Sequence, residues 1–300
     1  MDLRSPIAVT VAGLGQLGLP VAAALASAGH LVTGVDPQEA RRASATLHGL
    51  PNVRAELTTS DWKRTQVLVS VLPSDAATAA LADQAAAAMP PGAIHLCLGT
   101  ISVKLAASLS GCHSAAAQHF AACPVFGRPD EAWDRDLTAI FGPAICPSTD
   151  WHAMAHAVLG AFAPRRHQVP APESACAIKL AGNLLIASAI STMAEATRFV
   201  QAHGASAVSL HQVITGKLFQ GPVYEGVGHR LAHTADRGAA SNESPGFTIQ
   251  LGLKDMNLLC EAAATCGVPV ALADPIRRLL NRAVEQGHAN ADWADLPACH

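Results

Sequence analysis

Apolar residues along the chain follow two patterns, and the change between them falls near residue 170. In the first part, short apolar runs alternate with segments in which apolar residues recur every three or four positions, which is typical of strands and helices in turn. This alternation predicts an α/β domain built on a doubly wound parallel sheet. The expected strands are residues 7–12, 31–35, 66–71, 93–98, 118–123, 139–141 and 166–169, with helices at 75–89 and 150–162.

The second part of the chain has helical spacing throughout. Residues 173–203 contain no proline and repeat apolar positions at helical intervals, so they predict one long helix. Residues 231–245 are polar enough to suggest an exposed loop, and residues 294–300 a loose tail. We therefore expect two domains, residues 1–170 and an all-helical domain at residues 171–300. Further helices are expected at 205–219, 248–266 and 275–286.

A glycine motif directly follows the first apolar run. Gly13, Gly15 and Gly18 form a G-x-G-x-x-G pattern that opens an alanine-rich helical segment ending at Gly29. The first glycine permits a tight turn, the second lets the backbone approach a pyrophosphate, and the third lets the helix pack closely on the strand. The N-terminus of the helix then faces the phosphates. In this context the pattern predicts a dinucleotide site, with the cofactor-binding residues Gly13, Leu14, Gly15, Gln16, Leu17 and Gly18.

Asp36 closes the second apolar run at the distance expected of a ribose-binding acid. Its carboxylate would accept hydrogen bonds from an adenosine ribose and repel a 2′-phosphate, which favours NAD over NADP. Arg41 and Arg42 weaken this preference because either could reach a 2′-phosphate, although both also suit a solvated helix start. We therefore expect NAD as the preferred cofactor, with NADP as the alternative.

The composition indicates a globular chain and excludes several partners. Of 300 residues, 50% are hydrophobic and 14% charged, the net charge is −3, and no basic stripe is present, so we expect no nucleic-acid partner. Aromatic residues are only 4%, which also disfavours a base-stacking surface. With no apolar leader and no long uncharged apolar run, we expect a cytoplasmic protein that does not enter a membrane.

Cysteine and histidine residues offer only weak candidates for a metal site. Eight cysteines form no C-x-x-C pair, so a disulfide framework or a zinc ribbon is not expected. Without paired ligands at metal-binding spacing, structural roles are favoured and no metal is predicted. The residues of suitable type are Cys112, His113, His119 and Cys123, and the pair His152 and His156.

Lys179 and Asn183 are four residues apart in the long predicted helix and so share one face of it. They lie within a run of alanine, isoleucine and leucine. A lysine in such company either extends its ammonium to solvent or sits in a cleft, where loss of hydration would fit it for proton transfer. The residues alone leave both interpretations open.

Six segments occur in an order that resembles the β-hydroxyacid dehydrogenase family, which includes 3-hydroxyisobutyrate dehydrogenase within the 6-phosphogluconate dehydrogenase superfamily. The resemblance spans nearly the whole chain, and six ordered segments are far more specific than any one of them. The segments are GLGQLGLPVAAALASAGHLVTGVD, VLPSDAA, LGTIS, CPVFGRP, IKLAGNLL and LGLKDMNLLCEAAATCGVPVALA.

The resemblance implies a Rossmann domain, a long inter-domain helix and an all-α C-terminal domain for substrate binding and dimerisation. It further implies an NAD(P)-dependent dehydrogenase or reductase acting on the CH–OH group of a small β-hydroxyacid or its semialdehyde, as a homodimer or homotetramer. By the same resemblance Lys179 is the catalytic acid/base and Asn183 holds the substrate. The cofactor set gains Leu72, Pro73, Thr100, Phe247 and Lys254, and Ser102 lies on the substrate side.

One segment departs from the family pattern. Where the family often has Pro-Val-Ser-Gly-Gly for binding a substrate carboxylate, this chain has Phe126, Gly127 and Arg128 after Pro-Val. Phe126 adds apolar bulk, whereas Arg128 either clamps an anion in place of the serine or points to solvent as a structural arginine. All three are retained as substrate-binding candidates. The alternative functions are imine reduction and a dinucleotide-binding sensor without catalysis.

Overall fold

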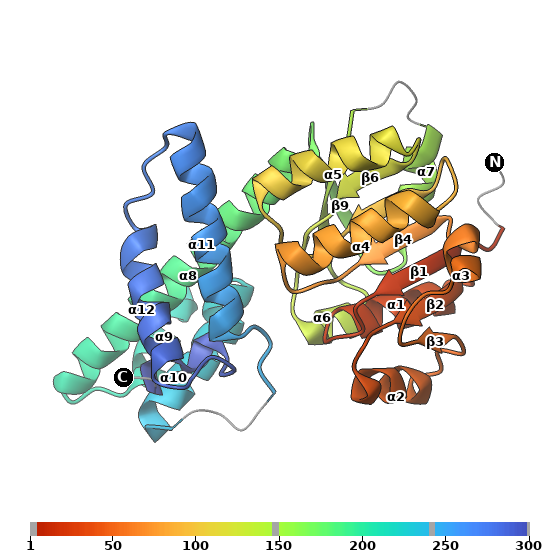
Figure 1. Cartoon of the computed structure of the whole chain (residues 1–300). Coiled ribbons are helices and arrows are strands. Elements are labelled where there is room, and N and C mark those ends of the chain that lie inside the picture. Colours follow the sequence, from red (N-terminus) through yellow and green to blue (C-terminus); the bar gives the residue numbers. More distant parts are fainter. Residues whose placement is uncertain (1–4, 146–149, 240–243, 299–300) are drawn as a thin grey trace. The chain divides into compact units, whose positions relative to one another are not determined.

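The computed structural model describes residues 5–145, 150–239 and 244–298. The chain divides into two compact units, Met1–Lys179 and Leu180–His300, called here the first and second unit and each described by itself. The division lies inside one helix, nine residues beyond the domain boundary expected at residue 170 (Figure 1).

The first unit is built on a nine-stranded sheet in the order β3-β2-β1-β4-β5-β6-β8-β7, with β9 paired to β8. In this order, all strands from β3 through β1 to β6 run parallel to one another, as the sequence predicts. At the other edge, β8 runs antiparallel to both β6 and β7 and parallel to β9. The strands are β1 Ala8–Ala12, β2 Leu31–Val35, β3 Val53–Arg54, β4 Val67–Ser70, β5 Ile94–Cys97, β6 His119–Ala122, β7 Val125–Phe126, β8 Thr138–Pro143 and β9 Arg165–Gln168.

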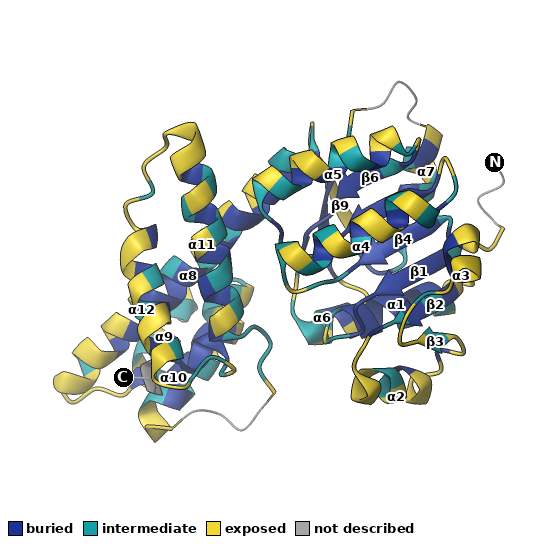
Figure 2. Ribbon diagram, viewed as in Figure 1, coloured by how far each residue is buried: buried dark blue, intermediate teal, exposed yellow. Residues whose placement is uncertain are grey.

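Helices cover both faces of this sheet, so its central strands are buried on both sides (Figure 2). In β4, Val67 and Val69 join the apolar cluster that includes residues of α1 and α7, whereas Leu68 faces Trp62 of α3 and Ala85 of α4. Helices α4 and α5 lie side by side across one face (Figure 1). The helices are α1 Gly18–Ser27, α2 Glu39–Leu47, α3 Thr59–Arg64, α4 Asp75–Ala88, α5 Val103–Ala115, α6 Pro129–Trp133 and α7 Asp150–Gly160.

The second unit is helical throughout the part that the structure describes. The long helix α8, Pro172–Ala202, begins in the first unit and agrees with the expected residues 173–203. By length and composition alone α8 is apolar enough to cross a membrane, and 44% of its most apolar window is buried within the protein. The other elements are α9 Ala207–Lys217, the π-helix η1 Val223–Val227, α10 Gly228–Arg237, α11 Ile249–Cys266, α12 Ala273–Glu285 and the 3-10 helix η2 Trp293–Ala298.

Two expectations for the second unit are wrong. Residues 231–237 of the expected loop belong to α10, where Leu231 and Thr234 are buried. The expected loose tail forms η2, in which Asp295 accepts hydrogen bonds from Arg230 at 2.8 Å and from Thr234 at 2.9 Å. The hydrogen bond from Thr234 to Asp295 joins the two segments inside the unit, so polar side chains expected to face water bind each other instead. Residues 240–243 and 299–300 of these predictions lie outside the described residues.

Candidate active site

The glycine motif forms the turn between β1 and α1 at the carboxyl edge of the sheet, where open α/β sheets bind ligands. Gly13 has a φ of +92°, and a Cβ at this position would collide with the carbonyl oxygen of Val71. A Cβ on Gly18 would collide with the carbonyl of Gly13. By contrast, a Cβ on Gly15 would meet only the guanidinium of Arg41, at 3.8 Å. Gly13 and Gly18 are therefore required by packing, whereas Gly15 leaves open space for a ligand.

Asp36 lies at the end of β2, is 1% exposed and braces the glycine loop. Its carboxylate accepts hydrogen bonds from the backbone N–H groups of Leu14 and Gln38, each at 2.9 Å. Arg41 Nη1 lies 3.3 Å from Asp36 Oδ2 with its side chain 45% exposed. Arg42 instead donates to the carbonyl oxygens of residues 36 and 37. Of the two arginines, Arg41 thus lies beside the glycine loop. It partly compensates the negative charge of Asp36, which would repel a 2′-phosphate.

The residues after β4 and β5 lie at the same edge of the sheet. Leu72 and Pro73 follow β4, and Thr100 follows β5. A Cβ on Gly99 would lie 2.8 Å from the carbonyl oxygen of Leu72, so these two loops are in close contact. Ser102 caps α5, because its hydroxyl accepts a hydrogen bond from the N–H of residue 105 at 3.0 Å. That hydroxyl therefore has a structural role, whatever it contributes to substrate binding.

Lys179 lies against the segment that departs from the family pattern. Its Nζ is 4.0 Å from the centroid of the Phe126 ring, and the lysine is only 9% exposed. Helix α8 starts close to the sheet, since a Cβ on Gly142 of β8 would lie 2.7 Å from Cβ of Ala175. Lys179 therefore does not extend its ammonium into solvent, which is one of the two interpretations that the sequence leaves open.

Gly127 and Arg128 shape the turn that follows Phe126. Gly127 has a φ of +141°, and a Cβ there would collide with the side chain of Leu137. The N–H of Arg128 donates to Glu131 Oε2 at 2.7 Å and so helps to start α6. The Arg128 guanidinium is 3.9 Å from Asp130, a weak ion pair at the surface. These contacts favour the structural interpretation of Arg128 over an anion clamp.

Two buried residues and the partly exposed Lys254 form a polar group in the second unit. The amide nitrogen of Asn183 donates to Asp255 Oδ2, and Lys254 Nζ lies 2.9 Å from Asp255 Oδ1. Asn183 is 2% and Asp255 1% exposed. Sequence reasoning missed Asp255, although a signal was present: it occupies a core position of α11, in the same stripe as Met256 and Leu259. Phe247, another expected cofactor residue, packs against Trp293 with the ring centroids 4.4 Å apart.

A chain of buried hydrogen bonds accounts for His113, one of the residues considered for metal binding. Gln118 Nε2 donates to the carbonyl of Met89 at 2.9 Å, so its Oε1 is left to accept from His113 Nδ1 at 2.8 Å. His113 Nε2 then accepts from His95 Nδ1 at 2.9 Å, and His95 Nε2 accepts from the Ser70 hydroxyl at 2.8 Å. This order fixes both rings as neutral Nδ1–H tautomers. Burial lowers the pKa of both histidines, that of His95 well below its ordinary value.

The remaining metal candidates also have structural partners. His119 stacks on Trp151 with centroids 5.0 Å apart, and His152 and His156 pack against Phe141. Burial raises the pKa of the Cys123 thiol well above its ordinary value, which opposes the thiolate that a metal would need. Within residues 5–145, 150–239 and 244–298, no group of three or more His, Cys, Asp or Glu side chains is arranged to hold a metal ion.

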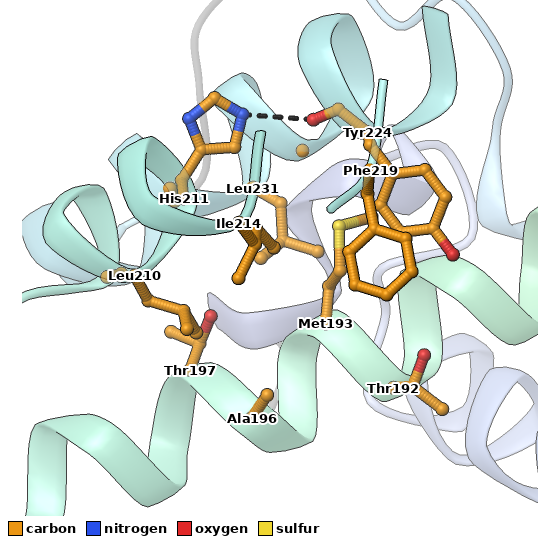
Figure 3. Close-up of a pocket in the computed structure, with 13 residues that line it drawn as sticks. Thr192, Met193, Ala196, Thr197, Leu210, His211, Ile214, Phe219, Tyr224 and Leu231 are labelled. Atoms are coloured by element: carbon orange, nitrogen blue, oxygen red, sulfur yellow. Dashed lines mark hydrogen bonds between the residues drawn. The ribbon is translucent and has the colours of Figure 1, made fainter. Parts of the chain in front are cut away.

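A cavity of about 260 Å³ lies within the second unit, between α8, α9 and α10 (Figure 3). Its lining is mostly apolar and includes Met193, Ile214 and Phe219. His211, which also lines the cavity, donates from Nε2 to the carbonyl oxygen of Tyr224 at 2.9 Å. None of the expected site residues lines this cavity.

Both parts of the chain match known domain families. Residues 8–168 match the NAD binding domain of 6-phosphogluconate dehydrogenase. Residues 174–297 match the domain described as NAD-binding of NADP-dependent 3-hydroxyisobutyrate dehydrogenase. The two matches follow one another along the chain and correspond closely to its α/β part and its helical part.

Similar proteins extend over most of the chain. It is 26% identical over 296 residues to the uncharacterized oxidoreductase YfjR of Bacillus subtilis (strain 168), covering 97% of this chain and 99% of that protein. It is 28% identical over 272 residues to a probable 3-hydroxyisobutyrate dehydrogenase of Mycobacterium bovis, covering 87% of this chain and 86% of that protein.

Solved structures share the fold at lower identity. A Mycobacterium tuberculosis 3-hydroxyisobutyrate dehydrogenase solved with L-serine has a TM-score of 0.80 at 24% identity, over 98% of each chain. A reductive aminase from Aspergillus terreus in complex with NADPH and ethyl levulinate has a TM-score of 0.59 at 21% identity, over 97% of this chain and 98% of that one. Identity this low supports the fold alone.

Proposed function

Because this chain belongs to the β-hydroxyacid dehydrogenase family and binds a nicotinamide cofactor, NAD or NADP, we propose that it oxidises a small β-hydroxyacid, or reduces the corresponding semialdehyde, with Lys179 as general acid/base. The observation that carries this proposal is the position of the Lys179 ammonium, which is buried against Phe126 one helical turn before Asn183. A cation withdrawn from water beside a substrate oxygen is suited to transfer a proton to it.

In the reductive direction the cofactor, when bound, supplies a hydride to the carbonyl carbon. As the C=O π bond breaks, its electron pair moves to the oxygen, and the Lys179 ammonium donates a proton there, leaving a neutral amine and an alcohol. Lys179 then regains a proton from water. In oxidation, the amine takes the hydroxyl proton as the hydride leaves the same carbon.

Asn183 orients the substrate in this proposal. Because its amide nitrogen donates to Asp255, the amide plane is fixed and the carbonyl oxygen and second N–H remain for a hydroxyl or carboxylate. Lys254 Nζ lies 2.9 Å from the other carboxylate oxygen of Asp255, so that acid is held between the lysine and the amide. Asp255 is thus a positioning residue for the substrate-binding amide.

The glycine turn and its neighbours would hold the cofactor. Gly15 leaves room for a pyrophosphate near the start of α1, whose first turn contains no acidic residue to repel it. Asp36 would receive the adenosine ribose, which keeps NAD as our preference. We also propose that the protein assembles as a homodimer or homotetramer and acts in the cytoplasm.

Imine reduction is the second candidate. It is favoured by Phe126, which places an aromatic ring beside Lys179 where the family often has a hydrogen-bonding serine, and by a fold shared with reductive aminases. A dinucleotide-binding sensor without catalysis is the third candidate.

The test follows the absorbance of NADH and NADPH with β-hydroxyacids, their semialdehydes and cyclic imines, for the wild type, Lys179→Ala and Lys179→Arg. We expect turnover of a hydroxyacid pair, and its loss by about a hundredfold or more in Lys179→Ala. Undiminished turnover in Lys179→Ala would refute the mechanism. Activity with imines alone would select imine reduction. Cofactor binding without turnover of any of these substrates would select the sensor.

A further inference from the structure

Phe126 and Lys179 come from elements that are each fixed by a glycine. Phe126 ends β7 and is followed by Gly127, which the φ of +141° and the contact with Leu137 restrict to glycine. Lys179 lies one turn after Ala175, which packs against Gly142 of β8. Since β7 pairs with β8, the ring and the start of α8 are held against the same strand.

The contact between them is a cation over an aromatic face. Lys179 Nζ lies 4.0 Å from the ring centroid, well inside the range of about 6 Å in which the ring quadrupole attracts an ammonium. Such attraction grows when water is excluded, and Lys179 is 9% exposed. Phe126 also packs against the buried apolar cluster that contains Ile101 and Cys176, which restrains the ring.

Phe126 cannot perform the task that the family's serine implies, because a phenyl ring donates no hydrogen bond to a carboxylate. We propose that Phe126 is a positioning residue for the proton donor: its ring fixes the Lys179 ammonium at one point, from which the proton reaches the substrate oxygen. This inference rests on the proposed role of Lys179. It predicts that the π face of residue 126, not its volume, supports turnover.

Two kinds of variant separate the π face from the volume. Phe126→Leu keeps an apolar side chain of similar bulk without a quadrupole, whereas Phe126→Tyr keeps the face. Fluorinated phenylalanines at position 126 weaken the quadrupole stepwise with almost no change of shape. Val169→Ala is the packing control, since Val169 packs against the same cluster as Phe126 and its loss leaves the aromatic ring in place.

We expect Phe126→Leu to lower kcat by about tenfold, because the ammonium loses its fixed position, with the Kd for NADH unchanged. Phe126→Tyr should retain kcat within about twofold, and successive fluorines should lower it progressively. Val169→Ala should leave kcat unchanged. The proposal is wrong if fluorination leaves kcat unchanged, or if kcat falls equally in Phe126→Leu and Val169→Ala.

A second readout needs no substrate. In protein labelled with ¹³C at lysine Cε, ring current should shift the Lys179 resonance upfield, and the shift should vanish in Phe126→Leu but persist in Phe126→Tyr. Without that shift in the wild type, the contact and the inference both fail. If the shift is present while Lys179→Ala remains active, the contact stands, and the proposed catalytic function fails together with the positioning role.

Discussion

Replacing His113 by leucine removes the central member of the buried chain that joins Ser70 to Gln118. Leucine fills a volume close to that of the imidazole, so the cost arises from lost hydrogen bonds. The variant leaves Gln118 Oε1 without its donor and the Nδ1–H of His95 without its acceptor. Each unpaired buried group costs about 1 to 3 kcal/mol, so the free energy of unfolding should fall by about 2 to 6 kcal/mol.

Urea unfolding at pH 8, followed by tryptophan fluorescence, measures this change. Three of the four tryptophans, Trp62, Trp133 and Trp151, lie in the first unit. The fluorescence therefore reports mainly the unfolding of the unit that contains the buried histidine hydrogen bonds. His167→Leu is the matched control, since His167 is exposed on β9 and should change stability by about 0.5 kcal/mol or less. Equal stability of the His113→Leu and His167→Leu variants would refute the reasoning.

The two buried histidines of this hydrogen-bond network make the stability of the protein depend on pH. Burial holds the pKa of His95 and His113 below the value of 6.5 that they have in the unfolded chain, so below about pH 6.5 the unfolded state binds more protons. Stability from these groups is therefore full above pH 6.5 and is lost as the pH falls, by up to about 1.4 kcal/mol per pH unit for each histidine. His113→Leu should flatten this dependence, and an unchanged slope would contradict the assignment.

Three further changes test other parts of the site. Arg41→Ala should weaken NADPH binding by about 10- to 100-fold and NADH binding little, with Arg42→Ala as the control; equal losses for both nucleotides in a fluorescence titration would oppose this role. Gly18→Ala should abolish cofactor binding or folding, whereas Gly111→Ala, where a Cβ meets nothing within 4 Å, should be tolerated in circular dichroism and binding assays. Asp255→Ala should lower kcat/KM by about tenfold or more with a small change in the Kd for NADH, and full activity would remove its positioning role.

The sequence was most informative where one period dominates. In the first unit, mostly apolar runs predicted strands such as β2 and β5, and the bounds of both agree with the predicted ranges to within one residue. Strand β7 could not be predicted in this way, since two residues carry no period, and its pairing depends on the turn at Gly127. The antiparallel edge of the sheet was missed for the same reason.

Polar residues inside the protein were harder to predict. The sequence singles out Asp36, but its hydrogen bond to the N–H of Leu14 depends on how β2 and the glycine turn meet in space. Asp295 lies in a segment that predicts a loose tail because it has no periodicity, whereas Arg230 binds this carboxylate within the unit. Asp255 could have been recognised from its place in the apolar stripe of α11.

The division of the chain after Lys179 has a practical consequence for dissecting the protein. Most two-domain chains can be cut in a linker, but here the division falls between two residues of one hydrogen-bonded helix. A cut at this point would leave four carbonyl groups on one fragment and four N–H groups on the other without their helical partners. It would also leave the expected proton donor on the last residue of one fragment and Asn183 near the start of the other. Separately expressed halves should therefore begin or end beyond α8, and the chemistry should be studied in the uncut chain.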